Sequence, residues 1–106
     1  METEAELRSK LNQETSRLAW SELQRFFAAG AVISVAAEVD LLEVAVCVAR
    51  DDAAQVSAWM NNGKIARVSD TQALAWSEEN AELWTVVVKP WILVQAAAQR
   101  AAPALH

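Results

Sequence analysis

A chain of 106 residues, 54% of them hydrophobic, is long enough for one hydrophobic core and too short for several domains. One cysteine and one histidine exclude an internal disulfide and argue against a zinc site built from protein ligands alone. The net charge of −5 and the scattered basic residues argue, on electrostatic grounds, against tight binding to nucleic acid.

The first predicted element is one long helix from Thr3 to Ala29. Thr3 and Glu6 have the spacing of a capping box, and Gly30 stands where a helix commonly ends. The apolar residues form two nearly opposite faces, one with Trp20, Leu23, Phe26 and Phe27 and the other with Leu7, Leu11 and Leu18. Either the helix bends between Asn12 and Ser16, or the three leucines form a homodimer contact.

The middle of the chain predicts short strands and helices with recognisable N-caps. The expected elements are a strand at 31–36, helices at 41–50 and 53–62, a strand at 64–69 and a helix at 70–80. Asp40, Asp52 and Asp70 stand at the starts of the three helices, where a carboxylate can accept from free backbone N–H groups. The helix at 53–62 is expected to direct Val56, Trp59 and Met60 into the core.

The most apolar stretch, Leu83 to Gln95, is predicted to be the centre of the sheet. Its β-branched and aromatic residues favour a strand from Leu83 to Lys89 with both faces covered. Pro90 has no N–H to donate, so the strand must end, bulge or lie at an edge there. A strand that resumes over Trp91 to Gln95 is favoured over a helix that begins at Pro90.

These elements predict a single small α+β domain over residues 1–106, with helices packed on a short, mainly antiparallel sheet. The ordered core is expected at 3–96, and 97–106 is expected to be a helix that fades into a frayed tail. Apart from the helix at 70–80, the order of elements is that of a winged helix, with Asp51 and Asp52 in the turn of its helix pair. This winged-helix-like interpretation does not by itself give a function.

The sequence contains no recognisable catalytic or metal-binding constellation. Cys47 has Arg50 one helical turn away, which would lower the pKa of its thiol, but Glu43 opposes this effect. His106 stands at the end of the predicted tail, so a Ser-His-Asp arrangement is not expected. We therefore expect no enzyme activity, no cofactor and no bound metal.

Five tryptophans are the unusual feature of the composition. The core is expected to contain Trp20, Trp59, Trp76 and Trp84. Trp91 follows the interruption at Lys89 and Pro90, and with Lys89 and Gln95 it would form a contact patch if exposed.

Four segments together resemble a small bacterial family: WSELQRFFAAGAVISV, VDLLEVA, DDAAQVSAWM and LWTVVVKPWILVQ. The likeness runs from about Leu11 to Gln95, and its most specific part is VVVKPWILVQ. The family is known as domain of unknown function 2288. The resemblance implies a bacterial, cytoplasmic protein and carries over no activity, cofactor or site residue.

Three hypotheses for the function remain. The first is a non-enzymatic protein-interaction module that binds a protein partner or itself, as the surplus apolar surface and the tryptophans suggest. The second is a winged-helix DNA-binding regulator, which requires a basic patch of Lys64, Arg67 and Lys89. The third is a small-molecule-binding protein, which requires a deep pocket near Trp91 with convergent polar groups.

The expected location is the cytoplasm. The N-terminal residues METEAELRSK do not have the basic-then-apolar pattern of a signal peptide. Lys89 and Pro90 interrupt the most apolar stretch, which argues against a membrane span there.

Overall fold

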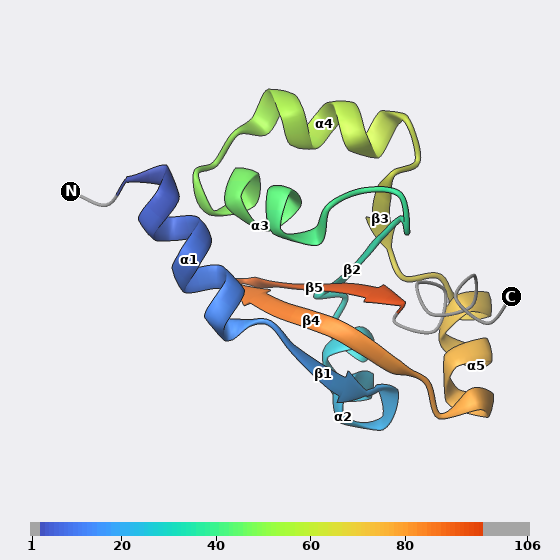
Figure 1. Ribbon diagram of the computed structural model, residues 1–106. Helices are drawn as coiled ribbons and strands as arrows, with labels where there is room; N and C mark the ends of the chain where they lie inside the picture. Colours follow the sequence, from blue (N-terminus) through green and yellow to red (C-terminus); the bar gives the residue numbers. More distant parts are fainter. Residues whose placement is uncertain (1–2, 97–106) are drawn as a thin grey trace, which may run out of the picture.

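A five-stranded sheet with helices on both faces forms the centre of the fold (Figure 1). The computed structural model describes residues 3–96, whose elements are α1 (Glu4–Glu14), β1 (Ser16–Ala19), α2 (Trp20–Ala28), β2 (Val32–Val35), α3 (Leu41–Ala49), α4 (Ala53–Asn61), β3 (Ile65–Arg67), α5 (Asp70–Glu79), β4 (Glu82–Val88) and β5 (Trp91–Ala96). The strand order is β1-β4-β5-β2-β3, with β2 and β5 parallel and the other neighbouring strands antiparallel. The predicted α+β fold with a mainly antiparallel sheet is therefore confirmed.

Side-chain alternation along the strands divides the core into two clusters. Val86 and Leu93 belong to the cluster covered by α1, α3 and α4, on what we call the α3–α4 face. Leu83 and Val94 belong to the cluster covered by α2 and α5, on the α2–α5 face. Because these four side chains are at most 1% exposed, each contributes roughly 1.5–3 kcal/mol of hydrophobic stabilisation.

The predicted central stretch folds as a hairpin between β4 and β5. Val88 lies opposite Trp91, and Lys89 and Pro90 form the turn, with a cis peptide bond between them. The missing N–H of Pro90 is tolerated there because the turn lies outside the strand ladder. The resumed strand is confirmed, but it lies beside β4 and does not continue it after a bulge.

The prediction of one long first helix is wrong. The chain leaves α1 at Glu14, forms the edge strand β1, and becomes helical again at Trp20. β1 pairs with β4, with Leu18 opposite Leu83. The apolar residues of the predicted long helix divide between the two faces of the sheet, because α1 covers the α3–α4 face and α2 covers the other.

The three leucines predicted to form a dimer contact pack within the chain. Leu11 is only 4% exposed and lies in the cluster of the α3–α4 face, against which Leu7 also packs. Leu18 lies on β1 and packs against the cluster of the opposite face. They do not form a common exposed surface, because α1 and β1 place them on different sides of the sheet.

The winged-helix interpretation is correct in its helix pair and wrong in its wing. α3 and α4 follow each other across a tight turn in which Asp51 has a positive φ of 60°. A wing would pair β3 with β4, but β3 pairs with β2 at the edge of the sheet and β4 lies between β1 and β5. Within residues 3–96 the two-stranded wing is therefore not formed.

The predicted helix starts are confirmed with one exception. The capping box joins Thr3 N–H to the Glu6 carboxylate at 2.8 Å, and the Thr3 hydroxyl accepts from Glu6 N–H at 3.1 Å. The Asp40 and Asp52 carboxylates cap α3 and α4. The exception is α5, where the hydroxyl of Ser69 is the cap, so Asp70 lies within the first turn.

Two further expectations concern the tryptophans and the membrane. Trp20 and Trp76 are buried as predicted, and Trp59 and Trp84 are half-buried against the core. Among the described residues, every helix is too short or too polar to cross a bilayer. The helix and frayed tail predicted for 97–106 lie outside the described residues.

Candidate functional site

A cleft of about 550 Å³ opens on the α3–α4 face, between α4 and the turn of the β4–β5 hairpin. We call it the Trp91 cleft. Its sheet side consists of residues from β2, β3, β5 and the hairpin turn. Its helical side consists of the end of α3, the turn after it, and α4. Apolar side chains from both sides line it, including Ile33, Val48, Val56, Met60, Ile65 and Leu93. Its volume lies within the range of about 300–1,000 Å³ that is typical of small-molecule sites.

The cleft exists because α4 covers the sheet incompletely. Val56 and Trp59 pack against the core, but no residue of α4 is fully buried. Met60 was expected in the core and is 52% exposed, because it faces the cleft and not the sheet. The helical spacing of Met60 predicted a core position, whereas the extent to which α4 covers the sheet depends on tertiary packing.

Trp91 and Arg67 meet at the sheet side of the cleft. Trp91 begins β5 and is half-buried on the same face as Leu93, two residues further on. Arg67 ends β3, with its guanidinium carbon 5.7 Å from the centroid of the Trp91 ring. A cation at this distance from an indole ring is attracted by the negative face of the π system. The contact therefore holds an arginine at the mouth of an apolar cleft.

The cleft also contains four charged side chains, divided between its two sides. Arg67 and Lys89 come from the sheet side, and Asp51 and Asp52 come from the turn between α3 and α4. Neither Arg67 nor Lys89 forms an ion pair within residues 3–96. Among the other cations of this part of the chain, Arg8, Arg17, Arg50 and Lys64 have carboxylate partners, and Lys10 and Arg25 have none. Two cations of the cleft are thus available to a ligand.

The structure brings together two of the three residues that were predicted to form a contact patch. Lys89 and Trp91 both line the cleft. Gln95 does not belong to this surface, because it is 1% exposed and its side-chain amide donates to the carbonyl oxygens of Ala36 and Val39 at 2.8 and 2.6 Å. Strand alternation correctly places Gln95 on the same face as Trp91, but the loop before α3 covers it.

The basic patch required for DNA binding is divided by local ion pairing. The Lys64 ammonium lies 2.6 Å from the Glu38 carboxylate, and this hydrogen bond holds the pKa of Glu38 below its ordinary value. Arg67 and Lys89 share their cleft with Asp51 and Asp52. Lys64, Arg67 and Lys89 therefore do not form a uniformly basic surface.

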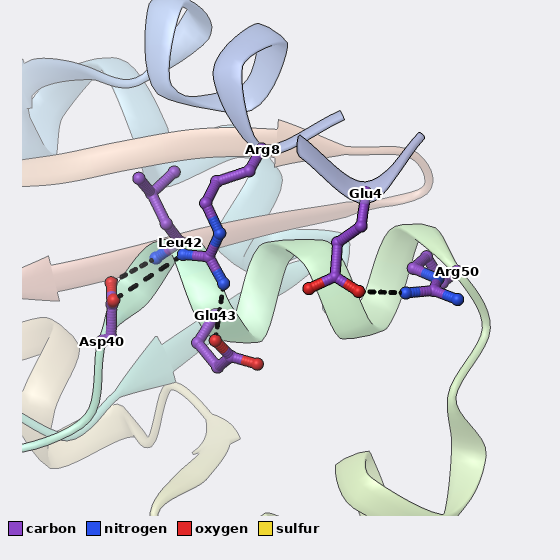
Figure 2. Close-up of polar contacts among 6 residues, drawn as sticks. All are labelled: Glu4, Arg8, Asp40, Leu42, Glu43 and Arg50. Carbon is purple, nitrogen blue, oxygen red and sulfur yellow. Dashed lines mark hydrogen bonds and ion pairs between the residues drawn. The ribbon is translucent and has the colours of Figure 1, made fainter. Parts of the chain in front are cut away.

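Ion pairs join α1 to α3 on the α3–α4 face (Figure 2). Arg8 lies 2.6 Å from the Glu43 carboxylate and 3.9 Å from that of Asp40. Glu4 pairs with Arg50 at the other end of α3, and the close-up shows the two pairs side by side along the helix (Figure 2). These contacts join α1 to α3. They also pair Arg50, the cation that could have lowered the pKa of the Cys47 thiol, with Glu4.

Cys47 lies in a second hollow, of about 340 Å³, beside these ion pairs. Burial is the main cause that raises the pKa of its thiol, and Glu43 raises it further, while Arg50 opposes them. The thiol is therefore protonated at neutral pH and is a poor nucleophile. Within residues 3–96 no group of three histidine, cysteine or acidic side chains is arranged to hold a metal ion.

Comparison with known proteins identifies the family of the chain. The family model described as "Protein of unknown function (DUF2288)" matches residues 6–96. The chain belongs to the DUF2288 family. The NMR solution structure of PA1075 from Pseudomonas aeruginosa is similar, with 42% sequence identity, a TM-score of 0.79, and coverage of 89% of this chain and 87% of that one. None of the curated proteins matches the chain.

Membership of the DUF2288 family confirms the resemblance found in the four sequence segments. The matched range contains the Trp91 cleft and both core clusters. The description of the family states no activity, so any function must be inferred from the geometry of this DUF2288 chain.

Proposed function

We propose that this DUF2288 protein is a non-enzymatic binding protein whose ligand is a small molecule held in the Trp91 cleft. The observation that carries the proposal is the placement of Arg67 over Trp91 at the mouth of an apolar cleft of about 550 Å³. Concave sites that are mostly apolar, with a few placed polar groups, are the usual form of small-molecule sites. We expect the protein to act in the cytoplasm.

The residues of the cleft have complementary roles in this proposal. Val56 and Met60 offer apolar surface, and the unbranched thioether side chain of methionine adapts to different ligand shapes. The ring of Trp91 restricts Arg67, so less side-chain entropy is lost when its guanidinium binds an anion. Lys89, on the hairpin turn, adds a second cation from the rim.

A protein partner is the second candidate, and the exposure of Met60 favours it. Met60 is 52% exposed at the edge of the cleft, and exposed methionines are common on surfaces that bind several partners. A side chain from a partner protein would then enter the cleft beside Trp91. This candidate keeps the interaction-module hypothesis but places the contact on α4 and the hairpin turn, away from Leu7, Leu11 and Leu18.

The proposal is tested by a fragment screen observed by NMR. The protein has five tryptophans, hence five indole N–H resonances, and Trp91→Phe identifies the resonance of Trp91. Compounds that bind the cleft are expected to shift this resonance and to leave that of Trp76, which is 5% exposed on the other face, in place. A screen in which hits shift Trp76 but not Trp91, or which yields no hit at Trp91, contradicts the proposal.

A further inference from the structure

We infer that the Trp91 cleft takes a small zwitterion with an apolar body, namely a short apolar peptide with both of its ends free. The inference rests on the proposed function and adds to it the chemistry of the ligand. It follows from the way in which charge is distributed over the two sides of the cleft.

The charges of the cleft balance but are separated. Arg67 and Lys89 belong to the sheet side, whereas Asp51 and Asp52 belong to the turn on the helical side. A simple anion attracted by the two cations would be repelled by the two carboxylates. A simple cation attracted by the carboxylates would be repelled by the two cations. A molecule with a positive end and a negative end satisfies both sides at once.

Arg67 is suited to hold the carboxylate end. Its guanidinium lies over the Trp91 ring and has no carboxylate partner within residues 3–96. The planar fork of an arginine matches a carboxylate through two parallel hydrogen bonds, which are stronger than bonds between neutral groups. Lys89 lines the same side and supplies a second positive charge without fixed geometry.

Asp51 is suited to hold the ammonium end. Its backbone is held in the left-handed region at φ 60°, in the turn that separates α3 from α4. Its carboxylate forms no hydrogen bond or ion pair within residues 3–96, whereas the carboxylate of Asp52 accepts from the N–H of Gln55 at 3.2 Å. Asp51 is therefore the freer acceptor of the two.

The apolar floor between the charged groups selects the body of the ligand. Ile33, Ile65 and Leu93 rise from the strands, and Val56 and Met60 face them from the helical side. In an amino acid both charges are attached to one carbon atom, whereas a peptide separates them by its length. Since the acids and the cations of the cleft lie on different sides, a dipeptide or tripeptide with aliphatic side chains fits better than a single amino acid.

Calorimetric titration with leucyl-leucine and its blocked forms tests the inference. The dipeptide with free ends is expected to bind, and either N-acetylation or C-terminal amidation should weaken binding about tenfold, because each removes one charged contact. Equal binding of the doubly blocked peptide would overturn the zwitterion and would favour a partner segment in the same cleft. If fragments shift the Trp91 resonance but no dipeptide binds, the inference fails while the proposed function stands.

Single substitutions assign each end of the peptide to its residue. Arg67→Met should weaken the free dipeptide about tenfold and leave the C-terminal amide unaffected. Asp51→Asn should weaken binding of the free dipeptide about tenfold and leave binding of the N-acetyl form unaffected. Asparagine tolerates the positive φ at this position. The matched control is Arg25→Met, because Arg25 also stacks on a ring, that of Phe26 at 4.9 Å, but belongs to α2. Wild-type affinity in Arg67→Met, or equal losses in Arg25→Met, would overturn the assignment.

Discussion

Arg67 and Trp91 touch although their strands are not neighbours in the sheet. β2 lies between β3 and β5, and Ile33 of β2 is opposite both Arg67 and Leu93. The long arginine side chain reaches across this strand to the ring of Trp91, with 5.7 Å between guanidinium carbon and ring centroid. The contact thus forms one side of the Trp91 cleft from two segments that are distant in the sequence.

This contact predicts how Trp91 responds to a quencher. The fluorescence that is lost in Trp91→Phe should be quenched by acrylamide, because the ring is half-buried, and Arg67→Met should steepen the quenching by uncovering it. The component lost in Trp20→Phe serves as control, since Trp20 is 1% exposed and should resist the quencher. If both components are quenched alike, Trp91 does not border an open cleft.

Gln95 is predicted to stabilise the fold and not to bind a ligand. Gln95→Leu removes the amide that donates to the carbonyls of Ala36 and Val39, and should lower the free energy of unfolding by about 2 kcal/mol. Urea denaturation measures this loss. Gln24→Leu is the control, because Gln24 is exposed and its 3.4 Å contact with Ser77 should be worth less than about 0.5 kcal/mol. Similar stabilities of the two variants would contradict the role given to Gln95.

Leu11 is predicted to act in the monomer core. Leu11→Ala should lower the free energy of unfolding by about 2–4 kcal/mol, because a 4% exposed side chain leaves a cavity in the cluster of the α3–α4 face. The mass measured by light scattering should equal that of the wild type. Leu74→Ala, at a 60% exposed position, should change stability by less than about 0.5 kcal/mol. A change of mass in Leu11→Ala would instead support the hypothesis that the leucines form a dimer contact.

The Glu38–Lys64 pair predicts a pH dependence of stability. The pKa of Glu38 is lowered from its ordinary value of 4.5 in the folded chain, mainly by the hydrogen bond from Lys64. A lowered folded pKa contributes stability above the unfolded pKa, and this contribution is lost as pH falls through the folded value. A double-mutant cycle of Glu38→Gln and Lys64→Gln should therefore show coupling at neutral pH that disappears at strongly acidic pH. Coupling that grows as pH falls would contradict this sign.

The local elements could be predicted because their signals lie within a few residues. Thr3 and Glu6 satisfy each other in a capping box, and Asp40 and Asp52 cap their helices through N–H groups two or three residues away. The β-branched run of β4 favours a strand whatever its neighbours are. Such interactions do not depend on the topology.

The edge strand and the site depend on contacts between distant residues, so the sequence pattern did not reveal them. Ser16–Ala19 is short and contains the helix-compatible residues Leu18 and Ala19, and it becomes a strand because β4 offers hydrogen bonds to it. The break at Pro90 left the burial of Trp91 open, and the pairing of Trp91 with Arg67 requires the register of β2 against both of its neighbours. Gln95 was misplaced because the loop that covers it, with Ala36 and Val39, is more than 50 residues away in the sequence.

The most direct test of the Trp91 cleft as a ligand site is to fill it. Ser57 is an exposed residue of the cleft, so Ser57→Trp should occupy the space while α4 is retained, and Ser77→Trp on α5 is the matched control. The measurement is an NMR titration of both variants with leucyl-leucine and with the hits of the fragment screen. We expect binding to be lost in Ser57→Trp and kept in Ser77→Trp. Binding that survives with wild-type affinity in Ser57→Trp would show that the ligand lies elsewhere and would contradict the proposed function.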